Sequence, residues 1–113
     1  MLHNAIYEKL KSVARDKKII PYSDVAPLAN LVMSNPDHRK QLAEILCEIS
    51  KYEHSQGRPM LSAVVTHKND PSPGHGFFTL ARELGLYRGH GDMEFLAEEL
   101  KRVWSYWSNQ PAN

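Results

Sequence analysis

The feature that most constrains the fold is a pair of short apolar stretches separated by a turn-rich segment. Residues 60–67 and 76–78 carry the β-branched and aromatic side chains that pack well in strands. The segment between them, Asn69–Gly74, combines Asn, Asp, Ser and Gly with two prolines, and these residue types favour an exposed turn. We therefore expect an antiparallel ribbon, in which two short strands are joined by a projecting loop.

Three segments before this ribbon have helical spacing. Residues 2–16 place their apolar side chains on one stripe, so they predict an amphipathic helix. A brief extended piece at 19–22 leads to Ser23, a good N-cap for a short second helix ending near Met33. Asn35 and Pro36 are a strong start signal for a third helix, which should run to about Gly57. We expect Glu44, Glu48 and Glu53 on the outer side of that helix.

Two helical segments follow the ribbon. Residues 79–84 predict one or two helical turns that stop at Gly85, and Asp92 can cap a last helix with a wide apolar face. The fold class expected is mainly α with a small β-hairpin (α+β), in the order α-β-α-α-β-β with two C-terminal helices. We assign residues 1–113 to a single domain, with its core in 2–78 and a helical extension at 79–108.

Charge and cysteine usage limit the classes of function. The formal net charge is only +1, so any nucleic-acid contact must come from a local basic patch. The single cysteine, Cys47, excludes an internal disulfide and fits a reducing compartment. Since the sequence shows neither a signal peptide nor a bilayer-spanning apolar run, we expect a cytoplasmic protein that does not bind membranes. No cofactor or metal is expected.

The exposed beginning of the third helix carries residue types that contact phosphates and base edges. These are His38, Arg39, Lys40 and Gln41. Arg58, at the junction of helix and ribbon, could bind an anion or cap helix carbonyls, and Lys68 and His75 flank the ribbon loop. Together these residues predict a non-catalytic nucleic-acid-binding module, such as a regulator.

The order of elements over residues 2–78 resembles a winged-helix domain, and winged-helix proteins read the major groove with their third helix. Residues 20–26 (IPYSDVA) are similar to the pattern with which the winged-helix part of alkyltransferase-like proteins enters its second helix. The chain lacks the Pro-Cys-His-Arg motif of the alkyltransferases, so alkyl transfer to Cys47 is not implied. Residues 57–65 and 73–78 also resemble a pattern from small uncharacterised bacterial proteins, which implies kinship but no activity.

Other functions remain open on the sequence. A small protein–protein interaction factor, such as an inhibitor, antitoxin or immunity-type protein, or a homodimer, could use the aromatic cluster of the last helix: Trp104, Tyr106 and Trp107. An acid/base or metal site would have to be built from His67, Asp70 and His75. The densest basic cluster could anchor phosphate or serve solubility, and it consists of Lys11, Arg15, Lys17 and Lys18.

Overall fold

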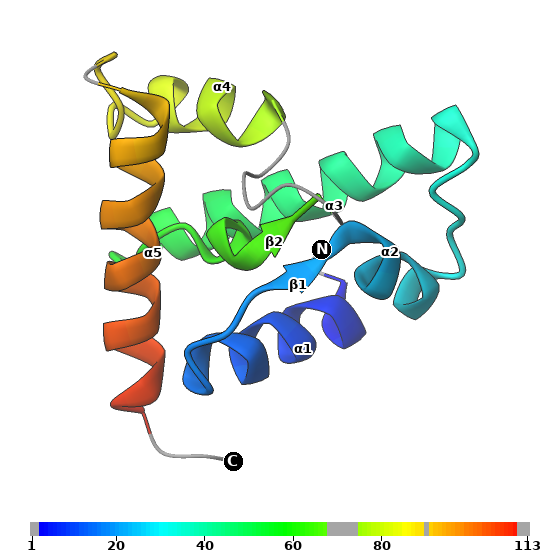
Figure 1. Ribbon diagram of the computed structural model, residues 1–113, viewed down its shortest axis with the longest axis horizontal. Helices are drawn as coiled ribbons and strands as arrows, with labels where there is room; N and C mark the ends of the chain where they lie inside the picture. The colour runs from blue at the N-terminus through cyan, green and yellow to red at the C-terminus, as the bar shows by residue number, and fades with distance from the viewer. Residues whose placement is uncertain (1–2, 68–74, 90, 111–113) are drawn as a thin grey trace.

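The computed structural model describes residues 3–67, 75–89 and 91–110 and is mainly helical (Figure 1). Its elements are, in chain order, α1 (Asn4–Arg15), β1 (Ile20–Pro21), α2 (Tyr22–Val25), the 3-10 helix η1 (Ala26–Ala29), α3 (Pro36–Ser55), the 3-10 helix η2 (Leu61–Val64), β2 (Val65–Thr66), α4 (His75–Glu83) and α5 (Asp92–Ser108). The strands β1 and β2 pair in parallel, with Ile20 opposite Val65 and Pro21 opposite Thr66.

The first helical prediction is confirmed, and the second is confirmed only in part. In α1 the His3 side chain accepts a hydrogen bond from the backbone N–H of Ile6, and one face of the helix is buried. The second segment is short and broken, because the helix α2 passes directly into η1 around Pro27. The predicted N-cap and end are wrong: Pro21 takes the N-cap position, Ser23 lies inside α2, and the helical residues stop before Met33. The segment ends at Asn30, which has left-handed backbone angles (φ 58°).

The long helix α3 begins and ends where its capping signals predict. The side chain of Asn35 accepts hydrogen bonds from the N–H groups of Asp37 and His38, and Pro36 is the first helical residue. After Ser55 the chain turns back through Gly57, whose φ of 75° is accessible to glycine at little cost. This turn carries the chain from the end of α3 into the centre of the molecule.

The predicted antiparallel ribbon is wrong in its second strand. Gly76, Phe77 and Phe78 lie in α4, where Phe77, Leu80 and Ala81 share one buried face. The first strand shrinks to the two residues of β2, since Leu61–Val64 form η2. A projecting ribbon leaves much of its surface in water, whereas every residue from Met60 to Thr66 is buried. This apolar run is a central core segment, and the predicted loop at Asn69–Gly74 lies outside the described residues.

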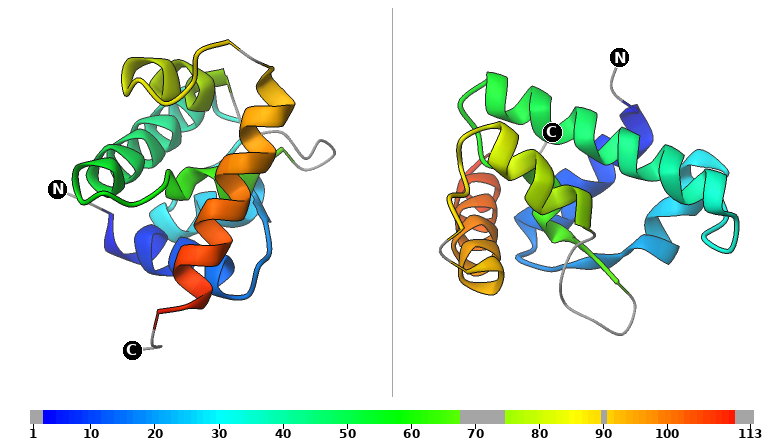
Figure 2. Two further views of the ribbon diagram at one scale, coloured as in Figure 1. Left: turned by 90° about the vertical axis from the view of Figure 1, so that its left-hand side faces the viewer. Right: turned by 90° about the horizontal axis from the view of Figure 1, so that it is seen from above.

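The core is built around η2, which contacts α1, α3 and α5. The helix α5 packs across α1 and η2 along one side of the molecule (Figure 2). Phe95 of α5 packs against Phe77 of α4 and stacks on Tyr87, with ring centroids 5.9 and 4.9 Å apart. The cluster of buried residues therefore draws on α4 and α5 as well as on the first part of the chain. None of the described helices is long and apolar enough to cross a bilayer.

Candidate functional site

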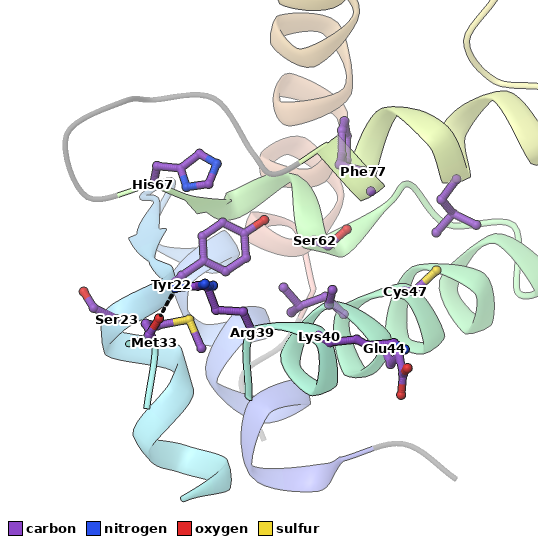
Figure 3. A pocket seen from close by; sticks show the side chains of 14 residues that line it. Tyr22, Ser23, Met33, Arg39, Lys40, Glu44, Cys47, Ser62, His67 and Phe77 are labelled. Carbon is purple, nitrogen blue, oxygen red and sulfur yellow. Dashed lines mark hydrogen bonds between the residues drawn. The ribbon is translucent and has the colours of Figure 1, made fainter. Parts of the chain in front are cut away.

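A groove with a volume of about 590 Å³ lies between α3 and α4. Its walls are mainly apolar, and Figure 3 shows the side chains that line it. The lining comes from six parts of the chain: Tyr22, Ser23, Met33, Arg39, Lys40, Ala43, Glu44, Leu46, Cys47, Ser62, His67, Gly76, Phe77 and Leu80. Such a groove can hold an apolar ligand or a segment of another chain.

The floor of the groove is fixed by core packing. Leu46, Phe77 and Leu80 are buried, so their side chains are held by the same contacts that stabilise the fold. The hydroxyls of Ser50 and Ser62 lie 2.6 Å apart in a hydrogen bond, and the N–H of Ser62 also donates to Ser50 Oγ. These bonds fasten η2 to α3, and the groove is therefore formed before any ligand arrives.

One rim of the groove is basic. Arg39 and Lys40 are exposed on the first turns of α3, and neither forms an ion pair with a carboxylate among the described residues. Arg39 Nη1 donates to the backbone oxygen of Met33 at 2.8 Å, which places the guanidinium beside the groove (Figure 3). The rings of Tyr22 and His67 also line the groove, with centroids 5.2 Å apart.

The predicted nucleic-acid residues do not form a single surface. His38, Arg39, Lys40 and Gln41 lie together at the start of α3, and His38 Nδ1 accepts a hydrogen bond from the N–H of Val32 at 2.9 Å. Arg58 pairs with Glu53 near the other end of α3, and Glu53 is roughly 21 Å of helix rise from Arg39. The structure therefore does not bring Arg58 to the same surface as Arg39 and Lys40.

The other predicted ribbon residues lie at or beyond the limits of the described ranges. Lys68 and Asp70 lie outside the described residues, and His75 is the first residue of α4. Within the described ranges, no group of three or more His, Cys, Asp or Glu side chains could hold a metal ion. Cys47 lines the groove and is half-buried.

Arg58 belongs to a buried polar network that the sequence did not predict. Its Nη2 lies 2.8 Å from Glu53 Oε2, and the hydroxyl of Tyr7 donates to the same oxygen at 2.9 Å. Glu53 is fully buried, which corrects its predicted place on the outer side of the third helix. Hydrogen bonding to Glu53 raises the pKa of Arg58, and burial together with the Glu53 bond raises the pKa of Tyr7. The guanidinium therefore stays charged and paired.

The aromatic cluster of α5 is largely used for packing. Trp107 is 7% exposed, and the ring of Tyr106 packs edge-on against it. Trp104 donates its indole N–H to the backbone oxygen of Lys18 at 3.0 Å, which ties α5 to the end of α1. These contacts hold α5 in place, while Trp104 and Tyr106 remain half-buried.

Comparison with protein-family models, with curated proteins and with solved structures gives no match to this chain. The geometry described above is therefore what supports a function.

Proposed function

We propose that the protein is a non-catalytic binding module whose groove holds an apolar, acidic segment of a partner protein. The observation that carries the proposal is the combination of apolar walls with a basic rim whose cations have no carboxylate partner among the described residues. Apolar side chains of a segment would fill the groove, and a carboxylate on it would meet Arg39 and Lys40. This is the interaction-factor class of function, with the groove in place of the aromatic helix as its binding surface.

Charge complementarity favours a protein segment as the occupant. Hydrogen bonds and ion pairs at a partly desolvated rim set the orientation of a ligand, while apolar contacts supply most of the affinity. Glu44 lines the groove and Glu48 is exposed one turn further along α3. These carboxylates would repel a polyanion that runs along the helix, but they leave room for a single acidic residue beside Arg39.

The test is selection of binding peptides from a phage-displayed random library on the purified protein. We expect enriched peptides that pair an acidic residue with Leu or Phe at helical spacing, and a synthetic consensus peptide that binds in fluorescence anisotropy. Ala43 is exposed and lines the groove, so Ala43→Trp should fill the groove and reduce affinity for that peptide at least about tenfold. Circular dichroism should show that the variant is folded.

A matched pair of charge reversals controls for electrostatics. Lys40→Glu changes the rim, whereas Lys51→Glu makes the same change on an exposed position of α3 that does not line the groove. We expect the first substitution alone to weaken the peptide. Equal loss in both variants, or unchanged binding by Ala43→Trp, would contradict the proposal.

A nucleic-acid-binding module is the second candidate. The observation that favours it is the consecutive run of His38, Arg39, Lys40 and Gln41 on the first exposed turns of α3. The helical order of a winged helix supports this candidate as well, although a helix takes the place of the second strand of the wing. Binding by phosphate neutralisation should weaken steeply between about 50 and 200 mM salt.

Labelled duplex and single-stranded oligonucleotides separate this candidate from the first. If nucleic acid is the ligand, Arg39→Ala and Lys40→Ala should each weaken binding and reduce its salt dependence, while Lys51→Ala should not. Undetectable binding at low salt would exclude the second candidate without affecting the first.

A further inference from the structure

The second region with features of a binding site is at the C-terminal ends of α1 and α5, close to Arg58. Trp107 is at its centre, and three cationic groups approach its ring: Lys11 Nζ at 5.8 Å and the Cζ atoms of Arg15 and Arg58, each at 5.9 Å from the ring centroid. Lys11 and Arg15 are four residues apart on α1, so they project from the same face of the helix. We call these four residues the Trp107 cluster.

Positive charge in the Trp107 cluster exceeds the negative charge that pairs with it. Arg58 is neutralised by the buried Glu53, and Lys11 pairs with Glu8, whose side chain is 62% exposed. Arg15 forms no ion pair within the described part of the chain. Because like charges held close together repel, an arrangement of this kind is stabilised when an anion binds among them.

Two buried hydrogen-bond donors of the cluster also lack an acceptor. Among the described residues, Arg15 Nε and Trp107 Nε1 are inaccessible to solvent and form no hydrogen bond. Trp107 is 93% buried, so water does not replace the missing acceptor. Leaving a buried donor unsatisfied destabilises the folded state, so such groups are rare in folded proteins. The indole of Trp104, on the same helix, does have its acceptor.

We propose that the Trp107 cluster binds a phosphate-type oxyanion, either inorganic phosphate or the phosphate group of a small monoester. A guanidinium grips a phosphate side-on through Nε and one terminal nitrogen, so a turn of the half-exposed Arg15 side chain toward the ligand satisfies its unpaired Nε. Lys11 adds a point charge, and the indole N–H of Trp107 supplies one further donor. The three acceptor oxygens of a phosphate match this mixed set of donors.

The test uses the two indole N–H signals in a ¹H–¹⁵N correlation spectrum, which Trp104→Phe assigns. Phosphate is titrated into the protein against sodium chloride of equal ionic strength. We expect a saturating shift of the Trp107 signal, while the signal of Trp104, which is already bonded to Lys18, stays nearly constant. Repeating the titration with methyl phosphate separates the two sources, since the tighter ligand identifies the free ion or the monoester.

One arginine variant and one lysine variant, both on α1, complete the experiment. Arg15→Gln should weaken binding about tenfold or more, because it removes a charge-assisted hydrogen bond. Lys9→Gln removes a charge from an exposed position of the same helix and should change the dissociation constant less than about twofold. Parallel, non-saturating shifts of both indoles, or unchanged binding in Arg15→Gln, would overturn the proposal.

Discussion

The two ends of α3 carry arginine side chains in opposite settings. At the start of the helix Arg39 is exposed and donates to a backbone oxygen, and Lys40 beside it has no carboxylate partner among the described residues. Past the end of the helix, the side chain of Arg58 is 19% exposed and is bound by Glu53, which is fully buried. The start of α3 therefore presents cations to solvent, whereas the arginine just past its end is held within the folded interior.

This contrast separates binding from stability. An exposed cation contributes little to the free energy of unfolding, since water solvates it in both states. A buried pair behaves differently, because removing one partner leaves the other uncompensated in a medium of low polarity. Substitutions at the start of α3 should therefore alter ligand binding in a folded protein, and substitutions at its end should alter the fold.

The largest effect should come from Glu53→Gln. The amide cannot neutralise Arg58, and we expect the free energy of unfolding to fall by about 3 kcal/mol in urea denaturation. Glu48→Gln changes the same residue type at an exposed position of α3 and should change that free energy by less than about 0.5 kcal/mol. Similar losses in the two variants would show that the buried network does not stabilise the protein as described.

Tyr7→Phe should have a smaller effect, and one that depends on pH. The variant loses a hydrogen bond to a carboxylate, so we expect a loss of about 1.5 kcal/mol at pH 7. Because the folded state raises the pKa of Tyr7 above its ordinary value of about 10, the fold favours the protonated phenol. This stabilisation is complete below about pH 10 and is lost as the pH rises further.

The wild-type protein should therefore lose more stability than Tyr7→Phe when the pH is raised from 9 to 11. Urea denaturation of both proteins at several pH values measures the difference. Parallel curves across this range would contradict the assigned role of the Tyr7 hydroxyl.

The smallest of the three effects is expected at the start of α3. Asn35→Ala removes the side chain that accepts from the N–H groups of Asp37 and His38, and should cost about 1 kcal/mol. Asn35→Asp keeps an acceptor at the same place and adds a charge that the helix dipole favours, so it should retain the stability of the wild type. A loss in Asn35→Ala close to that of Glu53→Gln would remove the contrast between the two ends.

The helices with strong periodic and capping signals could be predicted from the sequence. Both ends of α3 follow from Asn35, Pro36 and Gly57, which act through local backbone geometry. The start of α4 could not be predicted in this way, because Gly76–Phe78 is a short apolar run that fits a strand as well as a helix. In the structure this run is the first turn of α4, because Phe77 shares a buried helix face with Leu80 and Ala81.

The parallel pairing of β1 with β2 also depends on tertiary structure. Parallel strands need a long crossover connection, and here α2, η1, α3 and η2 all lie between the paired residues. The sequence around Ile20 and Pro21 predicts an extended piece but does not say which segment will lie beside it.

The candidate site was predictable only at its rim. The sequence shows Arg39 and Lys40 as an exposed basic turn, whereas the groove walls come from six separate parts of the chain. The Glu53 network was missed because a glutamate amid other helical glutamates has the pattern of a solvated face. The available signal was the spacing of five residues from Glu53 to Arg58 across Gly57, where the reversed chain brings the guanidinium back to the helix.

The position of α5 across α1 and η2 has a consequence for synthesis of the protein. The ribosome releases the chain from its N-terminus, so Leu61–Val64 emerge before the helix that covers them. Until α5 has left the exit tunnel, the nascent chain exposes the apolar segment that later becomes its centre. A premature stop codon ahead of Asp92 should therefore yield a product that chaperones hold and proteases remove.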